Sequence, residues 1–209
     1  MPAARDRWAY GRWAYGRWAR DRWARGARTA LLITAVAGAT LAAMPTSAAV
    51  AAEPPPGVIA IGDSVMLGAR WIMRKQGIMV DAKVSRQATS APAIMRRLGD
   101  RLPAAVVVHL GTNGTFPSST CRDIVNAAGP NRRVYLLTIK VPRRWERTNN
   151  AAIRACARRF PGQVTVVDWN WAASRHRTWL YSDGFHLRPA GARGYARVIQ
   201  DALARRSAS

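Results

Sequence analysis

The residue types needed for nucleophilic attack on an ester stand at the two ends of one segment of this chain. Ser64 follows an apolar stretch in the motif Gly-Asp-Ser-Val, and Asp183 and His186 stand three residues apart near the carboxyl end. A serine hydroxyl attacks a carbonyl efficiently when a histidine removes its proton and a carboxylate orients that histidine. We therefore expect Ser64 to be the nucleophile, His186 the general base and Asp183 its orienting group.

Apolar and helical stretches alternate between residues 57 and 206, which should position these side chains. Continuous apolar strands that alternate with helices are typical of a parallel sheet covered on both faces. With right-handed crossovers, this pattern predicts a three-layer α/β/α sandwich with a five-stranded parallel sheet. The expected strands are Val58–Ile61, Met79–Ala82, Ala104–Leu110, Val134–Val141 and Val164–Asp168, and the expected helices are Met66–Lys75, Ala91–Leu98, Ser119–Ala127, Asn149–Arg159 and Pro189–Arg205.

Polar residues follow the first three expected strands. Ser64 comes after the first strand, Ser85 after the second and Asn113 after the third. Ligands of such sheets bind beyond the carboxyl ends of the strands, which all lie at one edge. The three residues should therefore share that edge.

Three short motifs resemble the first, third and fifth blocks of the SGNH (GDSL-type) hydrolases: Gly62–Val65, Gly111–Gly114 and Asp183–Leu187. With Asp81–Gln87 and Val141–Glu146, the chain is most similar to the extracellular domain of peptidoglycan O-acetyltransferases, where this domain is usually fused to a multi-span membrane acyltransferase.

The resemblance implies a flavodoxin-like SGNH hydrolase fold, catalysis by the same three residues and no cofactor. It also implies an oxyanion hole made of the Ser64 N–H, the Ser85 N–H and the Asn113 side chain. The wider family has glycine where this chain has Ser85. Glycine tolerates backbone angles that serine adopts less readily, so this position departs from the pattern.

Aromatic residues and cysteines suggest further features of the domain. Trp145 follows the fourth strand and Trp169 the fifth, so both could line a sugar-binding cleft, with packing over the sheet edge as the alternative.

Cys121 and Cys156 fall in helices of consecutive βα units, and export would favour a disulfide between them over two isolated buried thiols. Two cysteines and three scattered histidines show no metal-ligand spacing, so we expect no metal.

The first 51 residues have the features of a secretory signal peptide. An Arg-Trp repeat precedes the apolar run 30–44, which is shorter than the ~20 residues of a membrane span, and small residues lead to a cleavage site after Ala51. An uncleaved anchor is the alternative. Residues 52–56 then form a Pro-rich spacer, and residues 57–206 form the catalytic domain. We expect the protein to be secreted or cell-wall associated.

A large positive charge points to polyanionic surroundings. The leader holds 8 of the 33 Lys and Arg residues and 2 of the 11 Asp and Glu residues, which leaves residues 52–209 with a net charge of +16. For an exported protein, anionic wall polymers are more natural partners than nucleic acid. We expect a monomer that interacts with cell-wall polysaccharide or another O-acylated glycan.

Together these features predict an exported serine esterase or acyltransferase that acts on O-acyl groups, O-acetyl above all, of cell-wall glycan through an acyl-enzyme. The sequence leaves open whether water or a sugar hydroxyl accepts the acyl group. A basic wall-binding module without turnover and an esterase of lipids or small esters are the alternatives.

Overall fold

Five parallel strands form the central sheet, in the order β2-β1-β3-β4-β5. The structure, a computed structural model, describes residues 56–207. The strands are β1 (Val58–Gly62), β2 (Ile78–Ala82), β3 (Ala105–His109), β4 (Arg133–Leu137) and β5 (Val164–Val167). All four neighbouring pairs are parallel, as the sequence pattern predicted.

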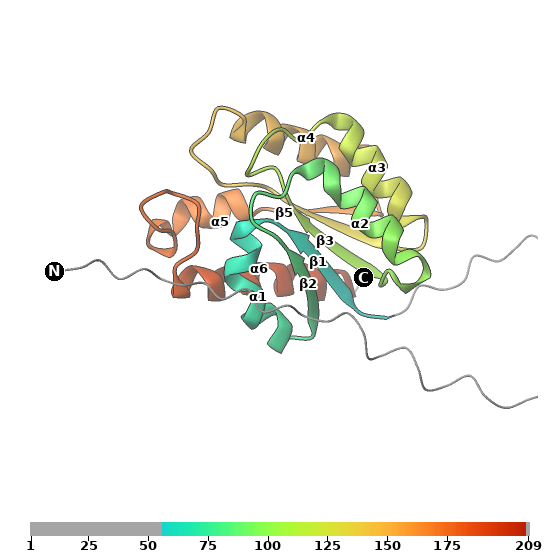
Figure 1. The fold of residues 1–209 in the computed structure, drawn as a ribbon, viewed down its shortest axis with the longest axis horizontal. Helices are drawn as coiled ribbons and strands as arrows, with labels where there is room; N and C mark the ends of the chain where they lie inside the picture. Colours follow the sequence, from blue (N-terminus) through green and yellow to red (C-terminus); the bar gives the residue numbers. More distant parts are fainter. Residues whose placement is uncertain (1–55, 208–209) are drawn as a thin grey trace, which may run out of the picture. The chain divides into compact units, whose positions relative to one another are not determined.

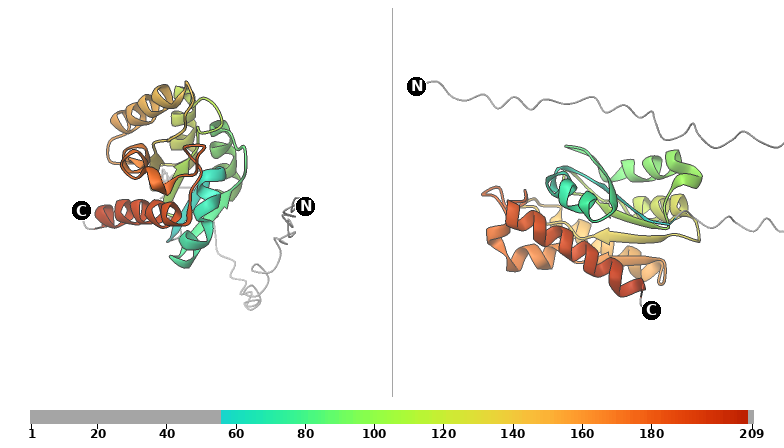
Figure 2. Two further views of the ribbon diagram at one scale, coloured as in Figure 1. Left: turned by 90° about the vertical axis from the view of Figure 1, so that its left-hand side faces the viewer. Right: turned by 90° about the horizontal axis from the view of Figure 1, so that it is seen from below.

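Helices cover both faces of this sheet and complete a three-layer sandwich (Figures 1 and 2). The helices are α1 (Ser64–Lys75), α2 (Ala91–Leu98), α3 (Ser118–Ala128), α4 (Glu146–Arg159), α5 (Trp169–Arg175) and α6 (Pro189–Ser207). Figure 1 shows α2, α3 and α4 on one face and α1, α5 and α6 on the other. Three short 3-10 turns join them: η1 (Ala88–Ser90), η2 (Gly99–Arg101) and η3 (Arg177–Trp179).

The central strands are apolar throughout because both of their faces are buried. In β3, Val106 and Val108 pack into the core beneath α2, α3 and α4, whereas Val107 packs into the core beneath α1, α5 and α6. Successive side chains of a strand point to opposite faces, so a strand between two helical layers needs an uninterrupted apolar run. This is why the strand positions could be predicted from the sequence.

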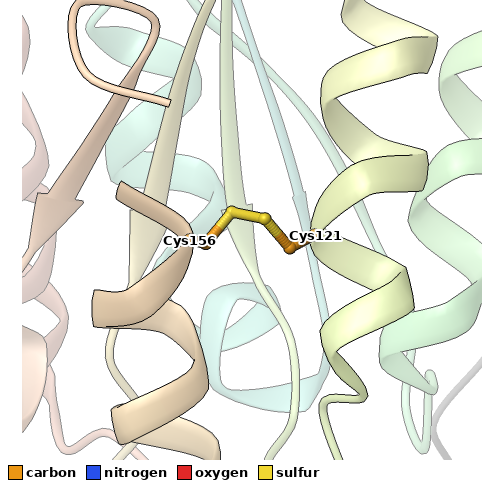
Figure 3. Close-up of a disulfide and its surroundings, with 2 residues drawn as sticks. All are labelled: Cys121 and Cys156. Atoms are coloured by element: carbon orange, nitrogen blue, oxygen red, sulfur yellow. A yellow bond between two sulfur atoms is a disulfide. The ribbon is translucent and has the colours of Figure 1, made fainter. Parts of the chain in front are cut away.

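A disulfide links two neighbouring helices of one layer. Cys121 of α3 and Cys156 of α4 are joined, with their Cα atoms 5.8 Å apart, as Figure 3 shows. Both residues belong to the core beneath α2, α3 and α4. The predicted pairing is therefore confirmed, and it fastens α4 to α3 beside the sheet.

Two elements differ from the expected pattern. Strand β4 ends at Leu137 rather than Val141, because the backbone of Ile139 bonds to the Asn150 side chain instead of to a neighbouring strand. The Asn150 amide accepts from the Ile139 N–H at 2.7 Å and donates to the Ile139 C=O at 2.9 Å. Helix α5 was not expected at all. It begins after Asp168, whose carboxylate accepts a hydrogen bond from the Trp171 N–H at 3.2 Å and caps the helix.

The expected signal peptide, residues 1–51, lies outside the described residues, as does the expected spacer apart from Pro56. Within residues 56–207, no helix combines the length and the apolar character that crossing a membrane requires.

Candidate active site

Ser64, His186 and Asp183 meet at the carboxyl edge of the sheet. Ser64 is the first residue of α1, directly beyond β1. The Nε2 atom of His186 lies 3.0 Å from Ser64 Oγ, and its Nδ1 atom lies 2.7 Å from Asp183 Oδ2. These distances form a continuous hydrogen-bonded chain from the hydroxyl through the imidazole to the carboxylate. Such a chain can move the serine proton to the imidazole.

A tight hairpin presents Asp183 and His186 to the serine. Leu180 and Leu187 form an isolated antiparallel bridge, and the Tyr181 N–H donates to the His186 C=O at 2.9 Å. At the tip, Gly184 adopts a φ of +81°, which a side chain would disfavour. The hairpin therefore fixes the spacing between the two side chains through local backbone bonds.

The Asp183 carboxylate has two tasks in this hairpin. Its Oδ1 atom accepts from the N–H groups of Phe185 and His186, each at 3.0 Å, while Oδ2 faces the imidazole. Partial burial raises the pKa of Asp183, but these backbone and imidazole hydrogen bonds outweigh it and hold the pKa below its usual value of 3.8. Asp183 is thus an anion at neutral pH, suited to orient His186.

Asp63, the residue before the nucleophile, is a fully buried carboxylate. It caps α1 by accepting from the Val65 N–H at 3.0 Å, and its other oxygen lies 3.4 Å from Asn113 Nδ2. Burial raises the pKa of Asp63 from 3.8 to about 6, against the opposing effects of its hydrogen bonds and of His186. The sequence motif contained this residue, but its role was not predicted. Its position just before a helix was the available signal.

Ser85 is the only non-glycine residue with a positive φ, +57°, between residues 56 and 207. The next residue clamps this loop, because the Arg86 guanidinium donates to the Gly62 C=O at 3.2 Å and to Asp81 Oδ1 at 2.6 Å. The left-handed backbone explains why glycine suits this position in the wider family. The clamp ties the loop after β2 to the end of β1, next to Ser64.

The loop that carries Asn113 is held by a buried side chain of α4. Asn149 donates to the C=O groups of Gly111 and Gly114 at 2.9 and 2.7 Å and accepts from the Phe116 N–H at 2.8 Å. Gln87 adds a bond to the Asn113 C=O at 3.0 Å. None of these supporting contacts was predicted. The only hint of Asn149 in the sequence was a pair of asparagines inside a helix, where the residue is uncommon.

The two tryptophans expected at the cleft have different positions. Trp145 is half-buried, and its indole N–H donates to the Thr112 C=O at 3.3 Å, beside Asn113. Its contact with substrate stays a prediction. Trp169 is 0% exposed, so of the two alternatives it packs inside the domain and does not line an open cleft. Its ring stacks on Trp179 and packs edge-on against Tyr195, because the first turn of α5 directs it into the core.

A buried histidine ends the third strand, in register with Gly62 of β1, and its hydrogen bond goes to Tyr195 rather than to the chain of Ser64, His186 and Asp183. His109 is 0% exposed, and its Nδ1 atom lies 2.8 Å from the Tyr195 hydroxyl. Burial lowers the pKa of His109 to about 3, which keeps the ring neutral. In the part of the chain that the structure describes, no group of three or more His, Cys, Asp or Glu side chains is arranged to hold a metal ion.

Comparison with known proteins agrees with the motifs. No protein-family model matches the chain. The chain is 34% identical over 150 residues to YrhL of Bacillus subtilis, a candidate peptidoglycan O-acetyltransferase, covering 70% of this chain and 23% of YrhL. It is 32% identical over 149 residues to the peptidoglycan O-acetyltransferase OatA of Listeria monocytogenes, covering 69% of this chain and 24% of OatA. The chain therefore spans about a quarter of the length of these curated relatives.

Solved structures match over most of their own length. The C-terminal catalytic domain of peptidoglycan O-acetyltransferase A from Streptococcus pneumoniae superposes with a TM-score of 0.65 at 27% identity, covering 72% of this chain and 93% of that domain. A family 3 carbohydrate esterase from Clostridium thermocellum shares the fold, with a TM-score of 0.53 at 15% identity. The expected SGNH-hydrolase fold and the resemblance to peptidoglycan O-acetyltransferases are confirmed.

Proposed function

We propose that this chain, a relative of the peptidoglycan O-acetyltransferases with the SGNH-hydrolase fold, is an exported serine acyltransferase or esterase that acts on O-acetyl groups of cell-wall glycan. The hydrogen-bonded chain from Ser64 through His186 to Asp183 carries the proposal. The relatives support the choice of glycan, since their names assign them to peptidoglycan. The net charge of +16 over residues 52–209 suits a monomer working among anionic wall polymers.

The first half-reaction transfers the acyl group from the donor ester to Ser64. As Ser64 Oγ attacks the carbonyl carbon, His186 Nε2 takes the hydroxyl proton, and Asp183 stabilises the resulting imidazolium. The tetrahedral intermediate then collapses. The bond between the acyl carbon and the donor oxygen breaks, and His186 returns the proton to that oxygen, which leaves as an alcohol.

Three donors are available to the oxyanion of the intermediate. The Ser64 N–H lies at the start of α1, where the first N–H groups of a helix have no acceptor within the helix, and Asp63 accepts from the N–H of Val65. The Ser85 N–H comes from the clamped loop, and the Asn113 amide is held by Asp63. Donors that are already in place stabilise the developing charge without reorganisation, each by roughly 2.7–4 kcal/mol.

The second half-reaction frees Ser64. A hydroxyl group attacks the acyl carbon, His186 takes its proton, and the bond to Ser64 Oγ breaks with return of the proton to the serine. A sugar hydroxyl gives acyl transfer, and water gives hydrolysis. The side chains of His186 and Asp183 are each 39% exposed, so water reaches the base directly. This exposure favours esterase activity whenever no glycan acceptor is bound.

The decisive experiment measures turnover of a small acetyl ester by the purified protein, with and without an oligosaccharide acceptor. Ser64→Ala should abolish turnover while circular dichroism shows an intact fold, and Ser119→Ala, at an exposed serine of α3, should change neither. Acetylated oligosaccharide as product identifies a transferase, and free acetate alone identifies an esterase. A folded Ser64→Ala variant with near-wild-type turnover would sink the proposed mechanism, whereas a folded wild-type protein without any turnover would favour a basic wall-binding module.

A further inference from the structure

A groove of about 870 Å³ lies behind the hairpin that carries Asp183 and His186. Its walls come from the loop that follows β4, from α5 with the turn that follows, and from the hairpin itself. The lining includes Lys140, Arg177, Tyr181, Ser182, Gly184 and Arg188. The proposed reaction uses none of these side chains, so the groove has no assigned task.

The groove is lined by cations and by no carboxylate. Lys140, Arg177 and Arg188 all contribute to its walls, whereas none of the lining residues is Asp or Glu. Arg177 is exposed and forms no ion pair with any carboxylate in residues 56–207. Lys140 lies 3.4 Å from Glu146, which is outside the lining. The groove therefore has a net positive charge and one guanidinium ready to bind an anion.

The Arg188 side chain is already ordered. Its Nε–H donates to the Leu180 C=O at 2.9 Å, and its guanidinium carbon lies 5.1 Å from the centre of the Tyr181 ring. These contacts fix one guanidinium in the wall with donors to spare. A preordered arginine loses little conformational freedom when it binds an oxyanion, and its planar fork matches carboxylate and phosphate groups.

The remaining lining suits a sugar. Tyr181 is 49% exposed, a high value for a large aromatic side chain at a groove, and Ser174, Thr178 and Ser182 add hydroxyl groups. An aromatic face packs against the apolar face of a sugar ring, while hydroxyls and cations take its polar substituents. The combination fits a glycan that carries acidic groups better than it fits a lipid chain.

The groove is connected to the hydrogen-bonded chain through the hairpin. Ser182 and Gly184, which line the groove, flank Asp183, and the Tyr181 N–H holds the His186 C=O. The Asp183 carboxylate faces His186 and backbone N–H groups and is not among the residues that line the groove. A ligand in the groove would therefore rest against the segment that orients the general base.

We propose that this groove is a subsite for an oxyanion, a carboxylate or a phosphate, carried by the glycan on which the enzyme acts. The inference rests on the proposed function, because it takes the glycan as given and assigns the part of the chain that recognises its acidic groups. Arg177 and Arg188 bind the oxyanion, and Tyr181 packs against the sugar that bears it.

The test is direct binding, measured by calorimetry with the Ser64→Ala protein so that turnover plays no part. The probes are peptidoglycan fragments released by a muramidase, the same fragments with their carboxylates amidated, and a poly(glycerol phosphate) chain. An Arg177→Gln variant is compared with an Arg175→Gln variant as a control. Arg175 is also exposed and lies two residues from Arg177, but it does not line the groove. An Arg177→Lys variant keeps the charge and serves as a check on folding.

Charge-assisted hydrogen bonds to an exposed oxyanion should favour the native fragments over the amidated ones by roughly tenfold. Arg177→Gln should remove most of that preference, Arg177→Lys should keep part of it, and Arg175→Gln should keep nearly all. Stronger Arg177 dependence for poly(glycerol phosphate), which contains no sugar ring, would show that the groove binds phosphate and would overturn the assignment of its oxyanion to the glycan. Two results would overturn the subsite. One is an equal loss of binding in the Arg177→Gln and Arg175→Gln variants. The other is equal binding of native and amidated fragments together with no Arg177-dependent binding of the phosphate polymer. These outcomes are independent of the Ser64 turnover test, which alone decides the proposed function.

Discussion

Replacing the buried Asp63 with asparagine should stabilise the protein at neutral pH and slow its reaction. The carboxyl has a pKa of about 6 in the folded chain and 3.8 as its ordinary value. The folded state thus holds the proton more tightly than the unfolded state, and the folding free energy contributed by this group is lost as pH rises from about 4 to about 6. A difference of about 2 pKa units corresponds to a loss of about 3 kcal/mol, at 1.36 kcal/mol per unit.

The Asp63→Asn variant carries no titrating group at this position and should escape that loss. Its Oδ1 atom can still accept from the Val65 N–H, as the carboxylate does at 3.0 Å. Its amide group would face the Asn113 amide, a donor against a donor, which costs about 1–2 kcal/mol at every pH. The free energy of unfolding of the variant, relative to wild type, should therefore rise by about 2.5 kcal/mol between pH 4 and pH 7, because the carboxyl of the unfolded chain is already more than half ionised at pH 4.

Urea unfolding followed by circular dichroism at pH 4, 5, 6 and 7 measures this rise, with Asp123→Asn at an exposed carboxylate of α3 as the control. The control should show a nearly flat difference from wild type. Turnover of a neutral acetyl ester by Asp63→Asn should fall by up to about 10²–10³-fold, because Asn113 loses the partner that holds it at 3.4 Å. A stability difference that does not change with pH would show that Asp63 is ionised without cost and would refute the reasoning.

Three further substitutions test separate parts of the structure. Asp183→Asn should lower kcat/KM by up to about 10⁴-fold. Because hydrogen bonds hold the pKa of Asp183 below 3.8, the wild-type protein should also lose more stability than the variant when the pH falls below 4, and acid unfolding curves of the two proteins measure this difference. Ser85→Gly should raise the free energy of unfolding by about 1 kcal/mol, because glycine tolerates a φ of +57° better than serine does, and it should leave turnover intact. Lys83→Gly, in the same loop, is the control and should lower the free energy of unfolding. Replacing both Cys121 and Cys156 with alanine should cost about 3–4 kcal/mol in chemical denaturation, given a sequence separation of 35 residues, and an equal stability of the two proteins would mean that the bond forms no constraint in solution.

The residues that touch the reaction could be found from the sequence because their positions follow from the strand pattern. Ser64, Ser85 and Asn113 each follow a strand of a parallel sheet, and such strands end at one edge. The spacing of Asp183 and His186 placed them within one turn, which the hairpin confirms. These are local features, readable without knowing which segments pack together.

The residues that support the site could not be found in the same way. Arg86 and Asn149 act across 24 and 38 residues, on Gly62 and Gly111, so their partners appear only once the chain is folded. The two alternatives left open for Trp169 have the same origin. A residue after a strand faces the edge or the core depending on how the next helix begins, and here the cap of α5 turns the ring inward.

The long separation between the serine and its histidine has a consequence for how the protein acquires activity. Ser64 and His186 meet across 122 residues, and four of the five strands and four helices fold from the chain between them. Contacts between such distant segments form late, after the entropy of closing the intervening chain has been overcome. Recovery of ester turnover during refolding should therefore lag behind the return of helical circular dichroism. Turnover thus reports completed assembly of the domain, and a folding chain stays inert until the hairpin that carries Asp183 and His186 has docked beside Ser64.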